Sequence, residues 1–189
     1  SGIVEDRFDD YTTWLRHRWF KVIERQSVPT VLDAGALGLA GKLSQPTLIT
    51  PHAGELSRIL KRLGTNVSAD EISDYPIEWA SEVANQLDVT VLLKGSKSVV
   101  VNSEIQIQLP AATPWLATAG SGDVLGGIIG AISASNEIEI LNSNTRFAEI
   151  AASASFIHDQ SGRLASKGGP ISASSIITRI PEAVRKILG

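Results

Sequence analysis

The spacing of apolar residues along the chain predicts strands that alternate with helices. Short β-branched or apolar runs predict three strands and a hairpin with its turn at Asn102 and Ser103. The strands cover residues 30–32, 47–50 and 89–93, and the two arms of the hairpin cover 98–101 and 104–109. The run at 89–93 is apolar throughout, which is typical of a strand covered on both faces of its sheet.

Apolar residues at helical spacing predict helices between and after these strands. The helices cover residues 4–25, 51–63, 76–87, 121–135, 147–157 and 176–187, with a helical turn at 36–40 and an interruption at Pro181 in the last of them. We expect Thr50 to cap the second helix and Pro51 to lie in its first turn. The helix at 121–135 is apolar almost all round, so it should be buried, and its glycines should let other backbone approach closely.

This order of elements implies an α/β layered fold with a largely parallel sheet. Nothing in the sequence suggests an internal repeat, a low-complexity tract or a linker, so residues 1–189 are expected to form a single domain.

Composition narrows the function classes. The chain has 189 residues, of which 43% are hydrophobic and 20% charged, and these values are typical of a soluble globular protein. The formal charge is −3, which offers no general electrostatic footprint for nucleic acid. Without Cys the chain has no disulfide, thiolate metal site or cysteine nucleophile, and its apolar stretches are shorter than a bilayer span. The chain also lacks Met, so we expect it to have been cut or processed before Ser1.

The strongest local signal for chemistry is the sequence ATAGSGD at residues 117–123, directly before the buried helix. Glycines at a helix start leave backbone N–H groups unshielded, and the helix dipole adds positive potential, so the segment should bind an anion. Asp123 would repel a phosphate unless it accepts a proton from a hydroxyl that attacks phosphorus. The alternative, that Asp123 only stabilises the helix N-terminus, has about equal weight from the residues alone.

Two further motifs follow predicted strands. LKGSKS at residues 93–98 offers two lysines and hydroxyls that could hold nucleotide phosphates, although an ordinary solvated turn explains it as well, and the spacing is not that of a Walker A loop. In TPHAGE at 50–55, His52 falls in the first turn of a helix, where the dipole favours a neutral ring that hydrogen-bonds a ligand. The alternative for His52 is a surface side chain, and Glu55 is explained by its place near a helix N-terminus.

The other candidates are weaker. His17 and His158 lie in predicted helices without a partner at metal-ligand spacing, so both should be structural or surface residues. Asp33 follows a strand and is a candidate ligand contact, but the sequence gives it no partner.

The three motifs together resemble those of the ADP/ATP-dependent NAD(P)H-hydrate dehydratases of the ribokinase-like superfamily. The similarity lies in TPHAGE, LKGSKS and ATAGSGDVLGG, and VLDAGAL at 31–37 looks like the LDADAL segment of that family. Ser1 and Gly2 look like the end of its Gly-Pro-Gly-x-Gly loop. GSGD alone is shared with ribokinase-like kinases, whereas its combination with the other two motifs is specific.

The chain departs from the family pattern at several positions. Gly35 replaces the second Asp of LDADAL, Ala53 stands where Pro is usual, and Pro114-Trp115-Leu116 replaces a Pro-Gly pair followed by Met. Residues 158–163 (HDQSGR) depart from HGxAGD. The changes at Trp115 and Arg163 put the substrate preference in doubt more than the activity.

The resemblance implies a function, a mechanism and a ribokinase-like α/β/α fold, of which residues 1–189 would be the C-terminal portion of one catalytic domain. Asp123 would deprotonate the ring hydroxyl of hydrated NADH or NADPH, the hydroxyl would attack the terminal phosphate of ADP or ATP, and loss of phosphate would restore NAD(P)H. Mg²⁺ would accompany the nucleotide without a dedicated carboxylate cage. The implied catalytic residues are Gly120, Ser121, Gly122 and Asp123; the nucleotide contacts are Lys94, Gly95, Ser96, Lys97, Ser98 and Gly122; and the hydrate contacts are Gly2, His52 and Asp123.

The family also implies a cytoplasmic homo-oligomer, accompanied by an NAD(P)H-hydrate epimerase domain or protein, with no membrane or nucleic-acid partner. Two other functions stay open. One is a ribokinase-like kinase for a small alcohol such as hydroxyethylthiazole, which the TPHAGE match disfavours. The other is a nucleotide-binding pseudoenzyme, which the presence of Asp123 disfavours.

Overall fold

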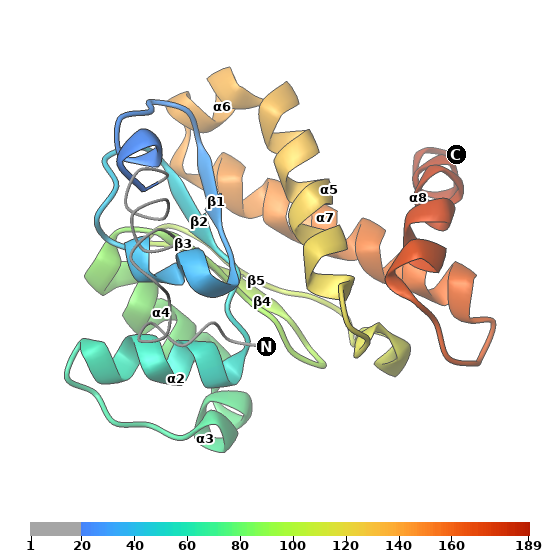
Figure 1. Ribbon diagram of the computed structural model, residues 1–189, viewed down its shortest axis with the longest axis horizontal. Helices are drawn as coiled ribbons and strands as arrows, with labels where there is room; N and C mark the ends of the chain where they lie inside the picture. The colour runs from blue at the N-terminus through green and yellow to red at the C-terminus, as the bar shows by residue number, and fades with distance from the viewer. Residues whose placement is uncertain (1–19) are drawn as a thin grey trace, which may run out of the picture.

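The structure, a computed structural model, describes residues 20–189 and contains one five-stranded sheet between two layers of helices (Figure 1). The strands are β1 (Thr30–Leu32), β2 (Thr47–Ile49), β3 (Thr90–Leu93), β4 (Val99–Val101) and β5 (Gln106–Gln108). The helices are η1 (Ala34–Leu39), α2 (Ala53–Arg62), α3 (Ala69–Asp74), α4 (Pro76–Leu87), η2 (Pro114–Leu116), α5 (Ser121–Ser135), α6 (Glu137–Asn142), α7 (Asn144–Ser166) and α8 (Ala173–Leu188). All predicted strands are present.

The sheet is mixed, with the strands in the order β1-β2-β3-β4-β5. The first three strands are parallel, whereas β4 and β5 are antiparallel to their neighbours. A hairpin joined by a tight turn has to be antiparallel, so the predicted hairpin makes the sheet less parallel than a strand–helix alternation alone suggests. The α/β class that the sequence predicted is confirmed.

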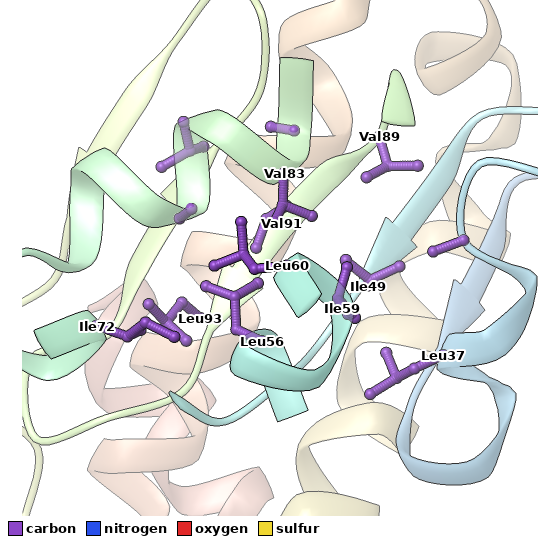
Figure 2. Close-up of a cluster of buried hydrophobic side chains, with 14 of the residues drawn as sticks. Leu37, Ile49, Leu56, Ile59, Leu60, Ile72, Val83, Val89, Val91 and Leu93 are labelled. Carbon is purple, nitrogen blue, oxygen red and sulfur yellow. The ribbon is translucent and has the colours of Figure 1, made fainter. Parts of the chain in front are cut away.

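Successive residues on the central strands face opposite helix layers, which explains why these strands are apolar throughout. On one face Ile49, Val91 and Leu93 pack against Leu56, Leu60 and Val83 of α2 and α4, and this cluster is drawn in Figure 2. On the other face Leu48, Leu92 and Val100 pack against α5 and α7. All three of these strand residues are fully buried.

The helix predictions differ from the structure in a few places. α2 begins after His52, which caps it, so neither Thr50 nor Pro51 has the predicted position. α3 and α6 were not predicted, because each has six residues and a single buried side chain, Ile72 or Ile140, which leaves no periodicity to detect. Of the predicted helix at 4–25, the structure describes only its last part, and residues 20–23 of that part are helical.

Two helices of the second layer depart from expectation in other ways. α8 continues through Pro181 instead of stopping there. In α5, a methyl group added to Gly126, Gly127 or Gly130 would meet no atom within 4 Å in the described part of the chain. The prediction that these glycines admit close backbone is therefore wrong. Within residues 20–189, no helix combines the length and apolar character needed to cross a membrane.

Candidate active site

The carboxyl ends of the three parallel strands meet at one edge of the sheet and bring three motifs together. β1 runs into Asp33, β2 into His52 and β3 into Lys94. Lys94 donates its N–H to the Pro51 carbonyl at 2.8 Å, and His52 forms an isolated parallel bridge with Lys94. This edge is the usual position for ligand contacts in open α/β sheets.

The N-terminus of α5 has the backbone geometry of an anion site. Gly120 caps the helix with a φ of 81°, in the left-handed region that favours glycine. The motif alone suggested that the Ser121 N–H is free. In the structure it donates to the Thr118 carbonyl at 3.2 Å. Among residues 20–189, no acceptor is found for the N–H groups of Gly122 and Asp123. These two groups, with the helix dipole, are available to a phosphate.

Lys94 and Asp33 form an ion pair beside this helix N-terminus. Lys94 Nζ lies 2.8 Å from Asp33 Oδ1, and both side chains are about three quarters buried. Burial raises the pKa of Asp33, but the hydrogen bond and charge of Lys94, with hydrogen bonds from Thr50 and the Ala34 N–H, outweigh it and hold the pKa below its ordinary value. Asp33 thus has the partner that the sequence did not reveal.

Gly122 lies against this ion pair. A Cβ atom built on Gly122 would be 3.7 Å from both Asp33 Oδ2 and Lys94 Nζ. The Asp33–Lys94 ion pair therefore lies beside the backbone of Gly122 in the first turn of α5. A cation next to a helix N-terminus can hold a phosphate group.

His52 caps α2 and contributes an exposed ring. Its Nδ1 accepts the N–H groups of Gly54 and Glu55 at 3.1 and 3.4 Å, while the carboxylate of Glu55 accepts the His52 N–H at 2.9 Å. A nitrogen that accepts hydrogen bonds carries no proton, so the geometry fits a ring protonated on Nε2 alone. The side chain is 53% exposed, and its Nε2 lies 3.5 Å from Glu55 Oε2.

Most of the candidate residues line one cavity of about 670 Å³, within the usual range for small-molecule sites. The residues of the three motifs that line the cavity are His52, Lys94, Gly95, Ser96, Ser98, Ala117, Thr118, Ser121 and Gly122. Its apolar wall is formed by Leu109, Pro110, Pro114, Leu116, Leu125 and Phe156. Lys97 does not line the cavity, and Gly2 lies outside the described residues.

Asp123 and Gly120 line a second cavity of about 590 Å³ on the other side of the same helix turn. Its remaining walls are apolar and come from α5, α7 and α8, including Val124, Ile157 and Ile177. The first turn of α5 therefore separates the exposed Asp123 carboxylate from the cavity that holds Lys94. Two ligands could approach this turn from opposite sides.

The sequence did not identify the contributions of α7. His158, which was predicted to be structural or on the surface, is buried, lines the first cavity and places Nε2 3.1 Å from Ser121 Oγ. Burial lowers the pKa of His158, although its hydrogen bond with Ser121 and the nearby Asp159 oppose this shift. The partial match of residues 158–163 to HGxAGD was the available signal for this region.

The departures from the family pattern have different surroundings. A side chain at Gly35 would meet nothing within 4 Å, so the missing Asp leaves open space. Trp115 is 38% exposed and lines neither cavity, whereas Arg163 contacts the cavity wall.

Magnesium has no preformed protein cage in the described part of the chain, where no three His, Asp or Glu side chains cluster as metal ligands. Mg²⁺ in nucleotide sites is held largely by phosphates and water, with one or two carboxylates. Asp33, beside Gly122, is a carboxylate that fits this arrangement.

The layered sheet, the glycine-capped helix and the adjacent lysine define an α/β protein suited to binding a phosphorylated ligand. A family model described as NAD(P)H-hydrate dehydratase matches residues 12–182. The chain therefore belongs to the NAD(P)H-hydrate dehydratase family, as its motifs predicted, and the fold of its structural neighbours is ribokinase-like.

Relatives of known name agree with this family. The bifunctional NAD(P)H-hydrate repair enzyme Nnr of Corynebacterium glutamicum is 34% identical over 185 residues, which cover 84% of this chain and 32% of the relative. The ADP-dependent (S)-NAD(P)H-hydrate dehydratase of Nitrosopumilus maritimus is 30% identical over 139 residues, covering 72% and 44%. The chain thus spans less than half the length of either relative.

A solved structure confirms the fold. The ADP/ATP-dependent NAD(P)H-hydrate dehydratase of Bacillus subtilis, co-crystallized with ATP and Mg²⁺, superposes with a TM-score of 0.71 at 24% identity, covering 90% of this chain and 59% of that one. A hydroxyethylthiazole kinase from Pyrococcus horikoshii superposes with a TM-score of 0.61 at 18% identity. Dehydratase and kinase share this fold, so the family match, and not the fold, separates them.

Proposed function

We propose that the protein containing this chain dehydrates hydrated NADH or NADPH back to NAD(P)H at the expense of ADP or ATP. The observation that carries the proposal is the position of Lys94 beside Gly122, at the turn of α5 where the N–H groups of Gly122 and Asp123 have no acceptor among residues 20–189. Membership of the dehydratase family supports the choice of reaction.

The first cavity suits a nucleotide in size and polarity. Its polar lining residues include Lys94, Ser96 and Ser98, and its apolar ones include Phe156 and Leu109. We assign the polar side chains to the phosphates and the apolar surface to the base and ribose. Lys97, although outside the cavity lining, adds a second cation to this loop. When Mg²⁺ is bound it would neutralise phosphate charge, with Asp33 as the carboxylate nearest to Gly122.

The chemistry requires a base on the opposite side of the helix turn. Asp123 would accept the proton of the ring hydroxyl as its oxygen forms a bond to the terminal phosphorus and the bond to the leaving nucleotide breaks. The N–H groups of Gly122 and Asp123, with Gly120 and Ser121 shaping the turn, would stabilise the transferring phosphoryl group. The lone pair of the ring nitrogen then breaks the C–O bond and expels inorganic phosphate, and the ring carbon next to the one that carried the phosphate loses a proton, which restores the ring double bond of NAD(P)H.

The hydrate would approach from the second cavity, because Asp123 lines it. His52 lies on the nucleotide side, so we propose that it contacts the hydrate where the two ligands meet. We propose that Gly2, from the loop that the family resemblance identifies, also contacts the hydrate.

The proposal is tested with the intact protein and enzymatically prepared NADH hydrate. Recovery of reduced-nicotinamide absorbance on adding ADP or ATP supports it, and Asp123→Asn should reduce the rate by at least about a hundredfold, as expected for loss of a general base. Wild-type recovery in that variant would refute the role of Asp123. Phosphate transfer to a thiazole alcohol without recovery would favour a kinase, and nucleotide binding without turnover would favour a pseudoenzyme.

The partner enzyme, the oligomeric state and the localisation are also proposals. An epimerase that interconverts the two hydrate forms would let the dehydratase use both, and the bifunctional relatives are consistent with such a partner. A cytoplasmic homo-oligomer stays the prediction from the family.

A further inference from the structure

Two charged side chains of α7 tie that helix to the segment that walls the first cavity. Asp159 Oδ1 accepts the Thr113 N–H at 2.7 Å, and Asp159 Oδ2 accepts Nε of Arg163 at 2.7 Å. Nη2 of Arg163 donates to the Ala111 carbonyl at 2.6 Å. One ion pair therefore holds the backbone of residues 111–113 at two atoms.

The same segment is bonded on its other side to the predicted nucleotide loop. The N–H of Ala112 donates to the Ser96 carbonyl at 2.9 Å, and the N–H of Leu109 donates to the Ser98 carbonyl at 2.9 Å. The segment thus lies between α7 and the loop, and a change in its position would move the carbonyls of Ser96 and Ser98.

The Asp159–Arg163 ion pair is placed to hydrogen-bond the backbone of residues 111–113. The Asp159 side chain is only 13% exposed, and both of its oxygens accept hydrogen bonds. A buried carboxylate is stable only when it is paired in this way. Arg163 lies in the last turn of α7, where the helix dipole favours a cation. Its Nε donates to Asp159, and its Nη2 donates to the Ala111 carbonyl of the wall.

Close packing adds a third connection between α7 and the wall. A Cβ atom on Gly162 would lie 2.7 Å from Cδ2 of Leu116 and 3.3 Å from Cγ2 of Thr113. The helix therefore approaches η2 as closely as a glycine allows. Asp159 and Arg163 stand where the HGxAGD pattern has Gly and Asp, so the pattern itself does not provide this ion pair.

We propose that Asp159 and Arg163 are positioning residues that set the affinity of the first cavity for the nucleotide. Asp159 also lines the cavity, and both residues act through the wall at 111–113 and its bond to Ser96, not on Asp123, which lines the other cavity. This inference rests on the proposed nucleotide site and goes beyond it by assigning its affinity to α7.

The test compares three variants of the intact protein with a matched control. Asp159→Ala removes both acceptors, Asp159→Asn keeps an acceptor for Thr113, and Arg163→Gln removes the charge. The control is Glu182→Gln, which breaks an ion pair with Arg179 at 2.9 Å on α8, away from the cavity. The readouts are ADP affinity by calorimetry, KM for the nucleotide, kcat, and Tm.

We expect Asp159→Ala and Arg163→Gln to raise the Kd for ADP and the nucleotide KM about tenfold, the factor that corresponds to loss of one charge-assisted hydrogen bond, with kcat changed less than about twofold. Asp159→Asn should recover part of that affinity, and Glu182→Gln should leave both constants at the wild-type value. A lowered Tm with unchanged ADP affinity would overturn the inference, because it would reveal a purely structural pair. Wild-type protein that binds no ADP would overturn it too.

Calorimetry distinguishes failure of this inference from failure of the proposed function. ADP affinity that falls in the variants, in a protein that does not turn over the hydrate, supports the positioning role and refutes the dehydratase. Turnover with ADP affinity equal in all variants refutes the positioning role alone.

Discussion

Replacing Gly120 with alanine tests whether the N-terminus of α5 is held in the geometry that the chemistry requires. Gly120 has a φ of 81°, and an alanine in the left-handed region costs about 1–2 kcal/mol. The new Cβ would also lie 3.1 Å from Cβ of Ala173 at the start of α8, so one of the two helices has to shift by a few tenths of an ångström. We therefore expect a loss of about 2 kcal/mol of unfolding free energy, or roughly 4–8 °C in Tm for a chain of this size.

A second substitution separates the two causes. Ala173→Gly removes the contact but not the backbone strain, so the double variant should recover only the part of the loss that came from the clash. Ala173→Gly alone gives the background, because glycine in the first turn of a helix has its own cost of up to about 1 kcal/mol. Gly126→Ala is the matched control on the same helix, where the new methyl group meets nothing within 4 Å and should be neutral or stabilising.

In Gly120→Ala, we expect kcat/KM to fall by a larger factor than the loss of unfolding free energy alone would cause. The N–H groups of Gly122 and Asp123 follow Gly120 directly, and a misplacement of reacting groups by about 1 Å can cost on the order of a hundredfold in rate. The assay is urea denaturation for the free energy, together with kcat/KM for the nucleotide-dependent recovery of NADH. A Gly120→Ala protein with wild-type Tm would refute the strain argument, and wild-type kcat/KM would refute the role of this turn in phosphoryl transfer.

Two further predictions concern the titratable groups of the site. Burial holds the pKa of His158 below its ordinary value of 6.5. Its contribution to stability is therefore complete above pH 6.5 and is lost as the pH falls through the folded-state pKa. His158→Gln should flatten the acid limb of the plot of Tm against pH, and parallel plots for variant and wild type would contradict this. The pKa of Asp33 is also depressed, below 3.8, so its pairing with Lys94 stabilises the fold at neutral pH and fades as acid protonates Asp33. A double-mutant cycle of Asp33→Asn and Lys94→Met should give a coupling of about 1–2 kcal/mol near pH 7 in denaturation experiments, and a coupling of zero there would refute a stabilising pair.

Local patterns in the sequence determined the secondary structure and the motifs. The continuous apolar run at 89–93 identified a central strand, because only a strand covered on both faces is apolar at every position. The hairpin after it followed from its turn residues, whereas α5, predicted to be buried, is buried on one side and exposed at Asp123, Gly127 and Ala131 on the other. The three motifs also identified the family, since their glycines, lysines and aspartate are needed at fixed spacing in the chain.

Contacts between distant segments required the tertiary structure. Asp33 and Lys94 are 61 residues apart and meet only because β1 and β3 end at the same edge of the sheet. His158 and Ser121 meet because α7 packs against the start of α5, and Asp159 reaches Thr113 across 46 residues for the same reason. The structure also places Asp123 outside the cavity that Lys94 and Gly122 line. Nothing in the sequence indicated this, because Gly122 and Asp123 are neighbours in one motif.

The physical reason for this division is the range of the interactions involved. Apolar periodicity and turn propensity are properties of neighbouring residues, so the sequence carries them directly. An ion pair or a buried histidine depends on which elements the core brings into contact, and the sequence encodes that only through the packing of the whole domain. The chain alone therefore identified which residues are candidates to bind a phosphate, and the fold decided which partners hold them in place.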